Sequence, residues 1–228
     1  MFKSTISQIS LINRTESPIM FSKSLILSFI IINEYVHINK EKSIHYFSLA
    51  ANLDDGPSQY YLGCHYYQNY KSKQDIKKCL YYLNMSCKNK FHMANFVYGF
   101  VLHEGKIVER NIKESIHYYK EASSFNIQYA KNNLGIIYMN GFEDIESNNS
   151  NAVIFFDEAI RQKNDYLSMY NLAHIYFFDE TFQNDFDKSI ELLIKSSKIF
   201  NHSFILLCLI IIKKFGNEIV GINEKIQE

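Results

Sequence analysis

The chain has 228 residues, of which 47% are hydrophobic and 21% are charged, a composition typical of a folded protein. Lys and Arg together number 24, as do Asp and Glu, and the basic stretch from Lys71 to Lys78 has no counterpart elsewhere in the chain. Because a nucleic-acid-binding protein is expected to carry a clustered basic face, this balance argues against that class of function.

The chain begins with a segment, residues 1–21, that we interpret as an N-terminal extension. It contains no continuous apolar run of the kind found in a signal peptide. One apolar run follows from Leu25 to Ile32, and a second lies at Phe204–Ile212. Both are much shorter than the roughly 20 residues that a membrane span requires. We therefore expect a cytoplasmic protein without a membrane span.

From residue 22 onward, a helical motif recurs along the chain. Its best copy has a small residue at Ala130, a large apolar residue at Leu134, a second small residue at Gly135 and an aromatic residue at Tyr138. Spacings of four and eight residues place these side chains on one face of a helix. A Gly inside a helix costs about 1 kcal/mol relative to Ala, so its recurrence indicates a closely packed neighbour. The copies begin at Ser22, Ser58, Ala94, Ala130, Ser168 and Ser203.

A second motif alternates with the first. The segment KSIHYFSLAA at residues 42–51 returns as ESIHYYKEAS at residues 114–123, and further copies lie at 78–87, 151–160 and 188–197. Successive copies are 36, 36, 37 and 37 residues apart. Such a constant period is the signature of a repeat protein.

Polar residues in phase with the repeat predict where the second helix of each pair begins and ends. Side chains that favour a helix N-cap precede it at Asn39, Asp75, Asn111, Asn148 and Asp185. Residue types that tolerate the left-handed conformation follow it at Asp54, Asn126, Asn164 and Asn201. Lys90 occupies the same position in the second copy and is the exception.

Two helices in every period predict an all-α fold, an α-solenoid of stacked antiparallel helix pairs. Neither helix buries its apolar face alone, so the pairs stack into one continuous superhelical core. We assign residues 22–216 to this array, with five full pairs over about 22–202 and a partial sixth. Residues 217–228 are interpreted as a tail or as a truncated last helix.

The third and fourth copies carry enough of the two motifs to suggest a family. The matching residues are Ala94, Tyr98, Gly99, Gly105, Val108, Asn111, Ser115, Tyr118, Tyr119 and Ala122, and then Ala130, Leu134, Gly135, Tyr138, Gly141, Ala152, Phe155, Phe156 and Ala159. In these positions the chain resembles the Sel-one-like repeat family, whose repeats are tetratricopeptide-like. The resemblance implies a scaffold or adaptor that binds other proteins or peptides through a concave groove.

The resemblance also implies an alternative function. Some members of the family accompany protein kinase domains, so the chain is alternatively a regulatory repeat fragment of a larger signalling protein. The apolar run SFILLCLIII at residues 203–212 favours this alternative, because terminal repeats usually need a polar cap, and it also suggests self-association through the terminal repeats.

No motif in the chain indicates catalysis. It contains no phosphate-binding loop, no His-Glu-x-x-His pair and no nucleophile elbow, so we expect neither an enzyme nor a cofactor or metal site. The four cysteines form no Cys-x-x-Cys pair and no phased pattern, which predicts ordinary buried thiols in a reducing compartment and argues against the disulfide-containing secreted branch of the family.

The candidate binding residues lie on the first helices, opposite the signature face. They are largely aromatic side chains of the types enriched at the centre of protein interfaces. If the first helices line the concave side, these residues form a groove; the alternative is that they pack against the next repeat. The candidates are Tyr60, Tyr67, Phe96, Phe100, His103, Asn132, Met139, Tyr170, His174 and Phe177.

Overall fold

The computed structural model describes residues 40–142, 145–182, 185–199 and 201–211. Over these ranges the chain is almost entirely helical and contains no β-strand beyond one isolated bridge between Phe142 and Ile145. The elements are α3 (Lys40–Ala51), α4 (Gly56–Asn69), α5 (Lys73–Lys88), α6 (His92–Glu104), α7 (Ile112–Ser124), α8 (Gln128–Asn140), α9 (Asn149–Lys163), α10 (Tyr166–Phe178), the short 3-10 helix η2 (Glu180–Phe182) and α11 (Phe186–Ser197). Residues 201–211 form a further helix.

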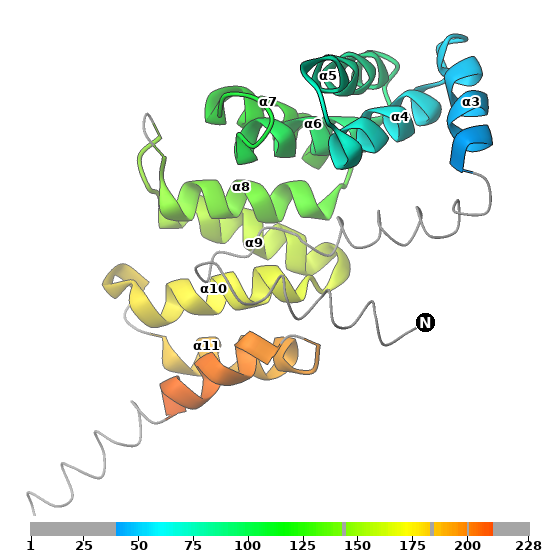
Figure 1. The fold of residues 1–228 in the computed structure, drawn as a ribbon. Coiled ribbons are helices and arrows are strands. Elements are labelled where there is room, and N and C mark those ends of the chain that lie inside the picture. The colour runs from blue at the N-terminus through cyan, green and yellow to red at the C-terminus, as the bar shows by residue number, and fades with distance from the viewer. Residues whose placement is uncertain (1–39, 143–144, 183–184, 200, 212–228) are drawn as a thin grey trace, which may run out of the picture.

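The helices pack as pairs, and the pairs stack in chain order. The most extensive contacts join α4 with α5, α6 with α7, α8 with α9 and α10 with α11. Smaller contacts join α3 to α4, α5 to α6, α7 to α8 and α9 to α10, so each pair rests on the next, as Figure 1 shows. The predicted all-α solenoid is confirmed. The first helix of the first pair, the extension at 1–21 and the tail at 217–228 lie outside the described residues, so the domain limits stay a prediction.

The signature glycines lie where the two helices of a pair touch. A Cβ atom on Gly63 would lie 2.6 Å from Leu83 Cγ, and one on Gly99 would lie 3.0 Å from Tyr119 Cδ1. Such separations are shorter than normal van der Waals contact, so a side chain at either position would push the helices apart. The predicted close approach is therefore confirmed, and it is made to the second helix of the same pair.

The N-cap predictions hold for three second helices and are wrong for one. Asn111, Asn148 and Asp185 each accept a hydrogen bond from the backbone N–H three residues later. The prediction of Asp75 as a cap is wrong, because α5 begins at Lys73 and its N-cap is Ser72. Asp75 instead completes a capping box, in which its carboxylate accepts from the Ser72 N–H.

The predicted left-handed positions hold in three of the four cases. Asp54, Asn126 and Asn164 have φ values of 59°, 62° and 52°. The prediction for Asn201 is wrong, because the chain is already helical at that residue. Lys90, which the sequence marked as the exception, also has a left-handed φ of 59°. The left-handed conformation at this position is therefore set by the short connection between one pair and the next, and not by the residue type.

Asn39 lies outside the described residues. The sequence pattern did not identify the caps of the first helices, although Asp55 and Asp165 accept hydrogen bonds from Ser58 N and Ser168 N at the starts of α4 and α10.

Candidate partner-binding face

Successive first helices contact one another at two places in the stack. Helix α4 contacts α6, and α8 contacts α10, more extensively than any two successive second helices contact each other. Because elements on the inner side of a curved stack lie closer together, these two contacts favour the concave side for the first helices. We call the surface of these four helices the first-helix face.

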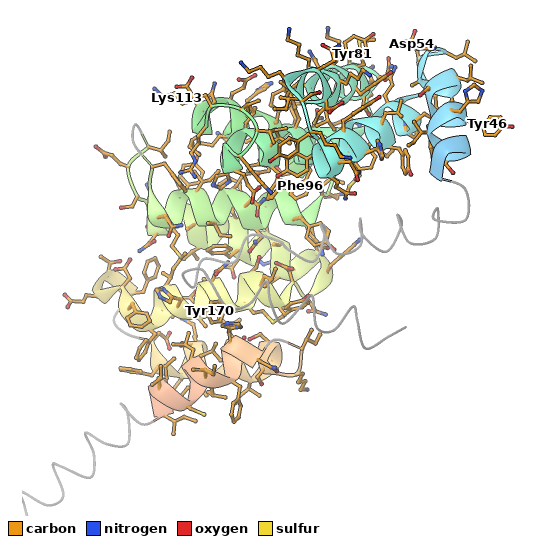
Figure 2. All side chains as sticks on the ribbon, viewed as in Figure 1. Tyr46, Asp54, Tyr81, Phe96, Lys113 and Tyr170 are labelled. Atoms are coloured by element: carbon orange, nitrogen blue, oxygen red, sulfur yellow. The ribbon has the colours of Figure 1, made fainter. Side chains whose placement is uncertain are left out.

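Six of the ten candidate residues are buried in the stack, and they come from three helices. Phe96 and Phe100 belong to the core around α4 to α8, and Tyr170 and Phe177 to the core around α10, α11 and helix 201–211. In Figure 2, Phe96 and Tyr170 lie on different first helices, with α8 between them. The six buried candidates are Phe96, Phe100, His103, Asn132, Tyr170 and Phe177. These six side chains therefore pack against neighbouring helices, as in the alternative to the groove.

The other four candidates, Tyr60, Tyr67, Met139 and His174, are only partly buried. Partner binding by any of the ten stays a prediction. The structure does show that several of them join successive first helices. Tyr67 Oη on α4 donates a 2.7 Å hydrogen bond to Glu104 Oε2 on α6. Such bonds between successive helices fix the spacing of the face.

Asn132 links α8 to α10 in the same way. Its Oδ1 accepts hydrogen bonds from Ser168 Oγ at 3.1 Å and from Asn171 Nδ2 at 3.2 Å. All three residues are buried, so these bonds lie inside the stack. A buried polar residue that is hydrogen-bonded to the next repeat favours one register between the two repeats, which is a structural role.

His103 is a buried, neutral residue. Burial and, to a lesser extent, the nearby Arg110 cation lower its pKa to about 4. Its ring lies edge-on to Phe142 at a centroid distance of 5.3 Å, and its Nδ1 is 3.5 Å from Tyr119 Oη, which in turn accepts from Asn133 Nδ2 at 3.0 Å. These contacts tie α6 to α7 and α8, and they give His103 a place in the packing between repeats.

An open pocket of about 700 Å³ lies on the first-helix face, between the last turn of α8 and the side of α10 from Tyr170 to Phe178. Three candidates meet there: Met139, Tyr170 and His174. The residues that complete its lining are Asn140, Asn149, Asn171, Ile175, Phe178, Asp179, Glu180 and Thr181. This volume is within the range of pockets that hold a small molecule or a short peptide segment.

The sequence pattern missed the acidic rim of this pocket and one aromatic wall. Phe178 continues the series Tyr170, His174 by one further helical turn, which is a signal that the sequence contained. Asp179 and Glu180 follow the end of α10, and Asn149 begins α9. Nothing in the repeat pattern places these three together, because Asn149 begins the second helix of one repeat and the other two follow the first helix of the next repeat.

The rim carries negative charge. Asp179 Oδ2 accepts from Asn149 Nδ2 at 2.6 Å, and Asp179 Oδ1 accepts from Thr181 N at 2.8 Å and from Thr181 Oγ1 at 2.7 Å. These hydrogen bonds lower the pKa of Asp179, and the one from the Thr181 hydroxyl contributes most, followed by the one from Asn149. Burial lowers the pKa of His174, which favours its neutral form. Asp179 and Glu180 are the only carboxylates in the lining, and it includes no Lys or Arg.

Within the described ranges, no group of three or more His, Cys, Asp or Glu side chains is arranged to hold a metal ion. In the same part of the chain, no helix is long and apolar enough to cross a membrane.

Comparison with protein families gives a match over most of the chain. The Sel1 repeat model matches residues 36–55, 56–91, 92–124, 128–164 and 167–198, and the last four matches follow the pairs from α4–α5 to α10–α11. The chain belongs to the Sel1 repeat family. The resemblance seen in the sequence is thereby confirmed. Sel1 repeats generally mediate interactions between proteins and are typically non-catalytic.

Solved structures of two other Sel1-type proteins have the same fold. A Sel1 repeat protein from Oxalobacter formigenes is 18% identical, with a TM-score of 0.60 over 68% of this chain and 62% of that one. A protective antigen with an SLR fold from uropathogenic Escherichia coli strains is 19% identical, with a TM-score of 0.62 over 68% of this chain and 33% of that one. The chain thus spans less than two thirds of either protein. No curated protein sequence matches it significantly.

Proposed function

We propose that this Sel1 repeat protein is a scaffold that binds a segment of a partner protein along its first-helix face. The observation that carries the proposal is the open pocket between α8 and α10, where Met139, Tyr170 and His174 meet. A surface that combines apolar and aromatic side chains with a few polar groups is typical of a protein-binding site.

We also propose that the protein works in a reducing compartment such as the cytoplasm. All four cysteines are free thiols, and Cys64 and Cys79 are buried. Burial raises the pKa of Cys79 to about 12, so this thiol stays protonated and unreactive at neutral pH. Free buried thiols are typical of proteins that are not exposed to oxidising conditions.

The scaffold proposal is tested by proximity labelling in the native cell. The test variant Met139→Ala/Phe178→Ala removes two walls of the pocket, and Tyr81→Ala is the control. Tyr81 is as exposed as Phe178, at 59% against 55%, but lies on the outer helix α5 (Figure 2). We expect the pocket variant to lose proteins that the wild type and Tyr81→Ala both label. If the pocket variant labels the same proteins as the wild type, or if only Tyr81→Ala loses them, the first-helix face is not the binding surface.

A further inference from the structure

The pocket on the first-helix face has a chemistry that selects one kind of partner segment. Met139 and Phe178 supply its accessible apolar and aromatic walls, above the buried Tyr170 and Ile175, and its rim carries the carboxylates of Asp179 and Glu180. Asp179 and Glu180 are the acidic residues of the lining, so the rim attracts cations. An acidic rim above an aromatic wall disfavours an anionic ligand and favours a cationic one.

The backbone around the pocket adds to this field. Met139 and Asn140 are the last two residues of α8, and Phe178 is the last residue of α10, so the C-terminal ends of two helices lie at this region. Each helix C-terminus carries about half a negative elementary charge. The opposing contribution comes from the start of α9 at Asn149, where the Asn148 side chain already accepts a hydrogen bond from the backbone. Two helix ends of one sign and one of the other leave a net preference for a cation.

The aromatic wall suits a flat or elongated cationic side chain. The Phe178 ring is 55% exposed, and its centroid lies 4.3 Å from that of His174. A guanidinium group or an ammonium group over an exposed aromatic ring gains a cation–π interaction, and the methylene stem of Lys or Arg packs on apolar neighbours. The carboxylate of Glu180 is exposed, so it is accessible to the charged end of such a side chain.

The size of the pocket indicates more than one side chain. A volume of about 700 Å³ is within the range that holds a short peptide segment, and it exceeds what a single side chain fills. The apolar part beside the partly exposed Met139 therefore accepts a second, apolar side chain.

Resting on the scaffold function proposed above, we infer that the pocket binds a partner segment in which an Arg or Lys side chain stands beside an apolar one. The basic side chain lies between Phe178 and Glu180, and the apolar one lies against Met139.

The test uses peptides of defined sequence. A library of random hexapeptides is selected on the wild-type protein, and representative synthetic hexapeptides are then titrated against the variants by NMR. We expect the selected peptides to carry Arg or Lys next to an apolar residue. Charge reversal by Glu180→Lys should weaken their binding about tenfold, since it replaces attraction with repulsion. The control Glu121→Lys, an exposed carboxylate on the outer helix α7, should leave binding unchanged.

Each other outcome overturns a specific statement. If the selected peptides are neutral or acidic, and Met139→Ala/Phe178→Ala weakens them while Glu180→Lys does not, the preference for a basic segment is wrong but the scaffold proposal stands. If no peptide is enriched, or if the enriched peptides bind the Met139→Ala/Phe178→Ala variant as well as the wild type, both the preference and the proposed binding face are wrong. Melting temperatures of all variants, measured in parallel, identify any loss of binding that comes from unfolding.

Discussion

The ring of Phe156 on α9 packs directly against the backbone of Gly135 on α8. A Cβ atom on Gly135 would lie 2.5 Å from Phe156 Cε1, far inside normal contact. The same relationship joins Gly63 to Leu83 and Gly99 to Tyr119 in the preceding repeats. The repeated glycine therefore sets the distance between the two helices of a pair.

Replacing this glycine should destabilise the protein although Ala is the better helix former. We expect Gly135→Ala to lower the free energy of unfolding by about 1–3 kcal/mol, because the added methyl group overpacks the contact. Denaturant unfolding measures the change. The control is the double variant Gly135→Ala/Phe156→Leu, which reproduces the buried pair Ala173 and Leu193 of the fifth repeat and should recover part of the loss. If Gly135→Ala alone is as stable as the wild type, the two helices move apart without a cost in free energy.

Replacing Lys90 should stabilise the protein. Lys90 holds a left-handed φ of 59°, which costs an ordinary L-residue about 1–2 kcal/mol. Asn tolerates this conformation better and occupies the equivalent positions at Asn126 and Asn164. We expect Lys90→Asn to raise the melting temperature, whereas Lys88→Asn, at the exposed end of α5, should not. If both variants melt alike, the strain at Lys90 is negligible.

Acidification should destabilise the protein through His103. Its pKa is about 4 in the folded chain and 6.5 when unperturbed, so between these values the unfolded chain binds more protons. Stability from this residue is therefore complete above pH 6.5 and falls as the pH drops toward 4, by about 1.4 kcal/mol for each pH unit. Denaturant unfolding at several pH values measures the slope.

The control for this prediction is His103→Met, which introduces the residue found at the equivalent position Met139. It removes this titrating group and should reduce the slope of unfolding free energy against pH between pH 6.5 and 4, leaving the smaller contribution of His174, whose pKa burial also lowers. Replacing the exposed His117 by Asn should leave the wild-type slope in place. If the unfolding free energy depends on pH in the same way for the wild type and for His103→Met, the lowered pKa of His103 is contradicted.

Phe100 should behave as a core residue. Its side chain is 5% exposed and packs in the core around α4 to α8. We expect Phe100→Ala to cost about 3–5 kcal/mol in unfolding free energy, comparable with a cavity at the fully buried Leu134. Met139→Ala, at a partly buried position, should cost clearly less. A Phe100→Ala variant with wild-type stability would place this ring in the groove and not in the core.

The helix at 201–211 offers a surface for self-association, which the sequence suggested and which stays a proposal. Phe204, Ile205 and Leu209 are each more than half exposed on it, and clustered exposed apolar side chains are typical of an interface. We expect sedimentation equilibrium to show a concentration-dependent dimer that Ile205→Lys/Leu209→Glu abolishes. Tyr46→Ser, at an equally exposed position on α3, should leave the dimer intact. A wild-type chain that stays monomeric at high concentration would contradict the proposal.

The candidate site shows where prediction from the sequence ends. Met139, Tyr170 and His174 were placed on one side of their helices correctly, because a helical period of 3.6 residues fixes which side chains share a face. Their exposure was not predictable in this way. Phe96 and Phe100 have the same periodicity and aromatic character as an open groove would need, yet the neighbouring repeat covers them.

The sequence by itself determined the repeat, its two helices, most of the second-helix caps and the close approach at the glycines, since each of these depends on side chains within one period of 36 or 37 residues. Only the tertiary structure decided which face of each first helix is open. That depends on how far each pair rotates against the next, and the rotation is set by contacts such as those of Asn132 with Ser168 and Asn171. The pocket beside Phe178, with its acidic rim at Asp179 and Glu180, exists because the end of α8, the start of α9 and the segment after α10 come together in the folded stack. No local pattern encodes that meeting.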